Sequence, residues 1–129
     1  MSTSFSKTNL RRDVENSAPK FGLPDTFEAR FAKTALEATD LGVSLQTLEP
    51  GSTMPFAHRH KEQPEEIYVV IAGSGAIIVD EVEHELGAWD VLHVAGPSAR
   101  HFKAGADGLE FLAFGRIGET SDAEMLPLE

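Results

Sequence analysis

Short stretches in which apolar and polar residues alternate run along most of the chain. Apolar residues stand at every second position from Phe27 to Phe31, and the same period of two recurs from Leu41 to Leu45. Successive side chains on a β-strand point to opposite faces, so this pattern predicts strands that each bury one face. The first stretch is also rich in Ala, Glu and Arg, so a helix stays open there.

Further short strands, separated by turn residues, are predicted in the second half. Residues 66–72 and 76–80 flank the sequence Gly-Ser-Gly at 73–75, which predicts a hairpin. Other strands are predicted in the ranges 82–86, 91–94, 99–103 and 109–115, with turns between them. Short strands with turns about every eight to twelve residues are typical of a sandwich or barrel. We therefore expect an all-β fold with little or no helix.

Three segments are expected along the chain. Residues 1–25 are polar and end in two prolines and a glycine, so they predict an irregular N-terminal arm. Residues 26–118 hold the predicted strands and form one domain, because 129 residues are enough to bury a single core. Residues 119–129 form an acidic tail with a few apolar residues, which is either mobile or packed along an edge.

The strand predicted at 66–72 is apolar on both faces. Ile67, Val69 and Ile71 point to one side, and the alternate residues, beginning with Tyr68, point to the other. The interior of one domain covers only one of these faces. The other face needs the N-terminal arm or a second subunit, which predicts a homodimer.

Charge and composition exclude several classes of partner. The chain has 11 Lys plus Arg against 21 Asp plus Glu, a net charge of -10, so nucleic acid and anionic membrane surfaces are not expected partners. It has no cysteine, which excludes disulfides and thiolate metal sites. No run approaches the roughly 18 apolar residues of a membrane helix, and the N-terminal residues lack the apolar core of a signal peptide. A cytoplasmic protein is expected.

The candidate chemistry lies in the middle of the chain. His58 and His60 are two residues apart, so they share a face of an extended segment, and the carboxylate of Glu65 or Glu66 follows after a short loop. Two imidazoles and one carboxylate bind Fe, Mn, Ni or Zn and leave positions open for substrate or water. Gln63 is a weaker oxygen ligand in the same loop. An ordinary exposed polar loop is the alternative interpretation.

This segment resembles the first motif of the cupin family, in which the order is glycine, five residues, His-x-His, three or four residues, Glu, six residues, glycine. The residues that carry the resemblance are Gly51, His58, His60, Glu66 and Gly73. Two spacings are one residue longer here, since six residues separate Gly51 from His58 and five separate His60 from Glu66. Glu65 fits the distance from His60, whereas Glu66 fits the six residues before Gly73. We favour Glu66, because the spacing of residues along a strand varies less than the spacing across a loop.

The resemblance extends over about residues 40 to 115 and is to small single-domain cupins of the uncharacterised conserved type. It implies a jelly-roll barrel, or double-stranded β-helix, that is dimeric. It implies no substrate.

The second cupin motif, glycine, five residues, Pro-x-Gly, two residues, His, is eroded. Arg100 stands where the family has its histidine, and His101 comes one residue later. On a strand this offset reverses the face, so His101 joins the site only if a bulge restores the register. A guanidinium cannot ligate a metal, so Arg100 suits an anionic group on a small ligand, or an ion pair with Glu65 or Glu66.

The sequence therefore predicts a small-molecule-binding cupin with a divalent metal site. Candidate metal ligands are His58, His60, Glu66 and His101, and candidate ligand-binding residues are Arg100, Tyr68 and Gln63. If the protein is an enzyme, the expected chemistry is that of an oxygenase or isomerase acting on an anionic small molecule. The alternatives are a non-catalytic ligand-binding or sensing cupin without a functional metal site, and a purely structural dimer.

Overall fold

The structure is a computed structural model that describes residues 4–116 and 123–128. Strands dominate this part of the chain: β1 (Phe27–Phe31), β2 (Leu41–Leu48), β3 (Ala57–His60), β4 (Glu65–Val79), β5 (Val82–Gly87), β6 (Val91–Ala95), β7 (Arg100–Arg116) and β8 (Ala123–Leu126). The helices are two single turns, η1 (Ala18–Phe21) and α1 (Lys33–Leu36). The all-β prediction is confirmed, and the strand alternative is the correct one for residues 27–31.

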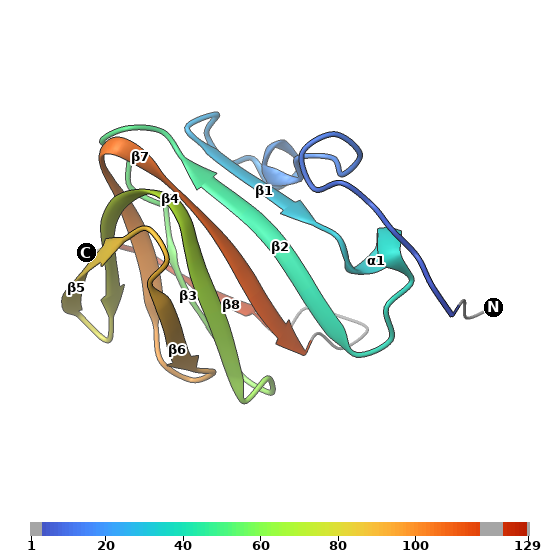
Figure 1. Cartoon of the computed structure of the whole chain (residues 1–129). Helices are drawn as coiled ribbons and strands as arrows, with labels where there is room; N and C mark the ends of the chain where they lie inside the picture. The colour runs from blue at the N-terminus through green and yellow to red at the C-terminus, as the bar shows by residue number, and fades with distance from the viewer. Residues whose placement is uncertain (1–3, 117–122, 129) are drawn as a thin grey trace.

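The described strands form one curled antiparallel sheet (Figure 1). Its order is β1-β2-β7-β3-β8, and β4 pairs with β7 while also pairing with β5 and β6. The pairing of β4 with β7 extends along most of both strands. These two strands are therefore the longest paired elements of the curled sheet. The candidate ligands lie near the first residues of β4.

The hairpin predicted at residues 73–75 is wrong, because β4 continues through them. A Cβ atom at Gly73 would lie 2.0 Å from the carbonyl oxygen of Gly108, and one at Gly75 would lie 2.1 Å from that of Lys103. Gly73 also has a φ of 80°. The glycines thus serve the close approach of β7, and the pairing shifts register on either side of Gly73.

The break predicted at residues 105–108 is also absent, because β7 runs through it as one strand of 17 residues. Gly108 has a φ of 79°, which a glycine adopts at no steric cost. The two predicted strands at 99–103 and 109–115 are therefore two halves of one bent strand.

An aromatic cluster fills the inside of the curl. The rings of Phe102 and Phe111 stack with centroids 4.0 Å apart, and Tyr68 meets both edge-on, at 5.0 and 5.8 Å. Tyr68 and Val70 are buried, whereas Ile67 and Val69 on the outer face are half-exposed. The prediction that β4 is apolar on both faces describes this strand correctly.

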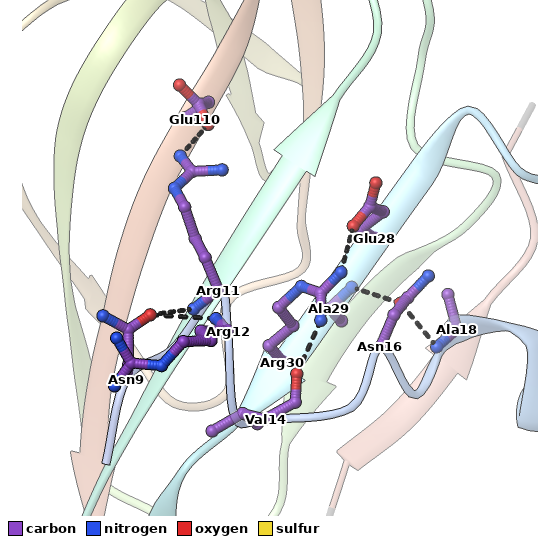
Figure 2. Close-up of polar contacts among 10 residues, drawn as sticks. All are labelled: Asn9, Arg11, Arg12, Val14, Asn16, Ala18, Glu28, Ala29, Arg30 and Glu110. Atoms are coloured by element: carbon purple, nitrogen blue, oxygen red, sulfur yellow. Dashed lines mark hydrogen bonds and ion pairs between the residues drawn. The ribbon is translucent and has the colours of Figure 1, made fainter. Parts of the chain in front are cut away.

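The N-terminal arm folds over the outside of the sheet in the same chain (Figure 2). Arg11 forms an ion pair with Glu110 of β7, and Arg30 of β1 donates a hydrogen bond of 2.5 Å to the Val14 carbonyl. The side chain of Asn16 accepts an N–H from β1 as well. Among the described residues, the arm therefore covers the outer face around β1 and β2 and does not cover that of β4 and β6.

The last described strand lies in the predicted tail. β8 pairs with β3, and Met125 is the cross-strand partner of His58. Of the two outcomes expected for the tail, packing along an edge is the one seen for residues 123–126. Among the described residues, no helix has the length and apolar character needed to cross a membrane.

Candidate metal centre

Backbone contacts to Gly96 hold the strand and loop that carry the ligands. The His60 N–H donates to the Gly96 carbonyl at 2.7 Å, and the Gly96 N–H donates to the Pro64 carbonyl at 2.9 Å. A Cβ atom at residue 96 would lie 1.8 Å from the Gln63 carbonyl oxygen, so only glycine allows this contact. The β3–β4 loop is thus fastened to the turn before β7, which fixes His60 relative to Glu66.

The three predicted ligands come together at the end of β3 and the start of β4. Glu66 Oε1 lies 3.7 Å from His58 Nε2 and 3.1 Å from His60 Nε2, and the two imidazole rings are nearly perpendicular. One donor atom from each residue can be chosen so that all three lie within 4.8 Å of one another. Two donors bound at about 2.1 Å to one ion are about 3.0–3.5 Å apart, so this spacing suits a metal.

The protonation states also suit a metal. Burial raises the pKa of Glu66, but the nearby imidazoles of His58 and His60 and the hydrogen bond from Tyr68 outweigh this effect and hold the pKa well below its usual value. Burial lowers the pKa of His58. At neutral pH Glu66 is therefore ionised and His58 is neutral, the forms that ligate metals. Among the described residues, His58 Nδ1 is buried without a hydrogen-bond partner, so the ring has an uncommitted nitrogen.

Glu65 lies on the outer face and is not part of this group. Its carboxylate pairs with His93 Nε2 at 2.9 Å, and its side chain is 61% exposed. Glu66, the neighbour favoured by the spacing to Gly73, is the carboxylate that faces the imidazoles.

Arg100 forms a buried ion pair with Glu66. It is the cross-strand partner of His58, it is fully buried, and its Nη2 lies 3.2 Å from Glu66 Oε1. Tyr68 donates its hydroxyl proton to the same oxygen at 2.5 Å and accepts from Arg100 Nε at 3.2 Å. Burial raises the pKa of Tyr68, and the charge of Glu66 adds to this, so the phenol stays neutral. The predicted pairing of Arg100 with a neighbouring glutamate is confirmed for Glu66.

A family model described as the cupin domain matches residues 44–112, more than half of the chain. The chain is a cupin. The resemblance noted in the sequence is thereby confirmed.

Known proteins are similar to this cupin over most of its length. Dimethylsulfoniopropionate lyase DddW of Ruegeria pomeroyi is 29% identical over 116 residues, which are 86% of this chain and 74% of the lyase. The crystal structure of a cupin protein from Bacteroides fragilis has a TM-score of 0.71 and 27% identity, and the match covers 93% of this chain and 91% of that one. A sugar phosphate isomerase of the cupin superfamily from Silicibacter pomeroyi has a TM-score of 0.68 and 27% identity, over 81% of this chain and 68% of that one.

His101 lies outside the ligand group of this cupin. It pairs with Ile78, whereas Arg100 pairs with Val79, so the two neighbours point to opposite faces of β7. Burial and the charge of Lys103 lower the pKa of His101 on that other face. No bulge restores the register at this position, and we therefore leave His101 out of the site.

Gln63 borders the site from the loop. Its side chain is buried and lies over Gly115, where a Cβ atom would be 2.8 Å from Gln63 Oε1. Gly115 is in turn the cross-strand partner of Glu66. The roles of Gly96 and Gly115 were missed by the sequence analysis, because alternation along a strand carries no signal for contacts between distant backbone segments.

Proposed function

We propose that this cupin is a metal-dependent enzyme that acts on a small anionic molecule. The observation that carries the proposal is the preassembled group of His58, His60 and Glu66, whose donor atoms lie within 4.8 Å of one another. When bound, Fe, Mn, Ni or Zn would act there as a Lewis acid, and three protein ligands leave positions for a substrate.

Charge favours an anionic substrate. The carboxylate of Glu66 is already balanced by the buried guanidinium of Arg100. A divalent ion at the same place would leave two uncompensated positive charges in a poorly solvated site, and a carboxylate or phosphate on the ligand would neutralise them. The names of two relatives support this choice, since one denotes a lyase of a propionate compound and the other an isomerase of sugar phosphates. We infer isomerase or lyase chemistry rather than oxygenase chemistry.

The chain's own residues would position the ligand. Gln63 has a buried amide over Gly115, the cross-strand partner of Glu66, and is proposed as a direct ligand contact. Arg100 and Tyr68 lie behind Glu66 and hold one of its oxygens, so they would act on a ligand through the position and charge of that carboxylate.

Titration of the metal-free chain with Mn²⁺, followed by calorimetry, tests the proposal. We expect one ion per chain in the native protein and no binding in His58→Ala. His84→Ala is the matched control, because His84 is exposed on β5 outside the ligand group. Equal binding by the native protein and His58→Ala would contradict the assignment, as would the absence of any binding.

The ion pair between Arg100 and Glu66 favours one alternative, a cupin that binds an anionic ligand without a metal. In that case the guanidinium already supplies the cation that Glu66 requires. A native chain that takes up no metal but is stabilised by small carboxylates or phosphates in a thermal shift screen would support this alternative.

We also propose that a second copy of the chain covers the outer face of β4 and β6. Two rows of cross-strand neighbours run from β2 across β7 and β4 to β6: Val43, Phe114, Ile67 and His93 in one, and Leu45, Leu112, Val69 and Val91 in the other. Leu45, at the β2 end, is already buried. Within these rows Val91 is 65% exposed and Phe114 is 38% exposed. A contiguous apolar face of this kind is typical of an interface, and sedimentation of the 14.0 kDa chain would test for a homodimer.

A cytoplasmic location stays a prediction, which cell fractionation would test.

A further inference from the structure

Residue 100 faces the candidate metal ligands directly. Because Arg100 of β7 and His58 of β3 are cross-strand partners, their side chains lie on the same face of the sheet. The Arg100 Nη2 atom lies 3.2 Å from Glu66 Oε1, which is also the oxygen nearest to His58 and His60. A guanidinium has no lone pair to offer a metal, so at this place it acts only as a fixed cation.

Hydrogen bonds hold this cation in place. Nη1 of Arg100 donates to the carbonyls of Gly96 and Ser98 at 3.0 and 2.8 Å, and Nε donates to the Tyr68 hydroxyl at 3.2 Å. Moving the guanidinium away from Glu66 would break these bonds inside the protein, where unpaired polar groups are costly. The charge of Arg100 is therefore a permanent feature of the site.

We propose that Arg100 competes with the divalent ion for Glu66, so that the side chain at position 100 sets the metal affinity of the site. The inference rests on the metal site proposed above. A metal ion between His58, His60 and Glu66 would stand beside a like charge that solvent screens poorly, and it would bind the same carboxylate that the guanidinium already pairs with. Substitution of Arg100 by an uncharged side chain removes both costs.

Calorimetric titration of the full chain with Mn²⁺ tests this inference in four proteins: native, Arg100→Met, Arg100→Lys and Arg116→Met. Methionine keeps much of the length of arginine without its charge, and lysine keeps the charge. Arg116 is the control, because it lies on the same strand and pairs with Asp40 at the surface, away from the site. We expect Arg100→Met to bind Mn²⁺ at least about tenfold more tightly than the native chain, since a nearby like charge is removed. Arg100→Lys and Arg116→Met should stay close to the native affinity.

An affinity of Arg100→Met equal to or below the native value would overturn the inference, as would an equal gain in Arg116→Met. The double variant His58→Ala/Arg100→Met must lose the gain in Mn²⁺ affinity, which would show that the gain arises at this site. Circular dichroism shows whether Arg100→Met is folded; if it is not, Arg100→Gln, which keeps an amide donor, is titrated under the same criteria.

Failure of this inference and failure of the proposed function give different results. If the native chain binds no Mn²⁺ and Arg100→Met binds it, the competition by Arg100 is supported and the metal-dependent function is not. If both bind with the same affinity, the metal site stands and the competition is refuted.

Discussion

One carboxylate oxygen of Glu66 contacts most of the polar groups of the site. Its Oε1 accepts hydrogen bonds from the hydroxyl of Tyr68 and the guanidinium of Arg100, and it faces His60 at 3.1 Å. A buried ion pair contributes little net stability, but loss of one partner leaves the other charge buried and unpaired. The residue is therefore structural in the metal-free chain as well as a candidate ligand.

Glu66→Gln is expected to lower the free energy of unfolding by about 3 kcal/mol, because Arg100 loses its only charged partner among the described contacts. Glu65→Gln is the matched control. Its carboxylate is largely exposed and pairs with an exposed histidine, so a change below about 0.5 kcal/mol is expected. Urea unfolding of the metal-free proteins measures both, and an equally small loss in both variants would refute the role assigned to Glu66.

The spacing of residues in the sequence identified the candidate ligands, but it did not predict the position of Arg100 beside them. His58 and His60 share a face because they are two residues apart on a strand, and the distance to Gly73 selected Glu66 over Glu65. The fixed position of Arg100 could not be predicted in the same way. It depends on the carbonyls of Gly96 and Ser98, whose directions are set by a turn.

At the scale of elements, the long strands β4 and β7 depend on glycines where their backbones approach closely. The sequence Gly-Ser-Gly at 73–75 has the composition of a hairpin turn, and local pattern alone favours that interpretation. The deciding interaction is the pairing of these residues with a strand about 30 positions later, which no local pattern contains. The place and facing of most strands could be predicted, whereas their number and continuity could not.

Gly75→Ala should destabilise the protein by about 2 kcal/mol, because its methyl group would collide with the Lys103 carbonyl and force β4 and β7 apart. Gly87→Ala, on β5, has open space at the Cβ position among the described residues and should change stability by less than about 0.5 kcal/mol. Thermal unfolding of both variants checks this, and similar melting temperatures for the two would contradict the close packing of β4 on β7.

For the whole molecule, the arm and the outer face of the sheet are the features that bear on the proposed dimer. The arm is held on its own chain by Arg11 and Arg30, so it shields β1 and β2 but not the parts of the two rows that lie on β4 and β6. Alternation predicted that β4 needs cover on both faces, and the structure shows that the arm supplies only part of it.

Val91→Glu is expected to shift the protein from dimer to monomer, because it places a charge at the exposed β6 end of an apolar row. Val82→Glu is the control, since Val82 is similarly exposed but lies on β5 outside these rows. Analytical ultracentrifugation at micromolar concentration distinguishes the two. A native chain that sediments as a monomer would refute the dimer, and dissociation by both variants would refute the interface assigned here.

We propose that His58, His60 and Glu66 together hold a divalent metal ion. The most direct measurement is an anomalous difference map from crystals of the native chain grown with Zn²⁺, recorded at the zinc absorption edge. We expect one peak per chain, at about 2.0–2.2 Å from one nitrogen of each imidazole and from a carboxylate oxygen of Glu66. A map with no peak among these three residues, at a Zn²⁺ concentration that produces peaks elsewhere on the molecule, would contradict it.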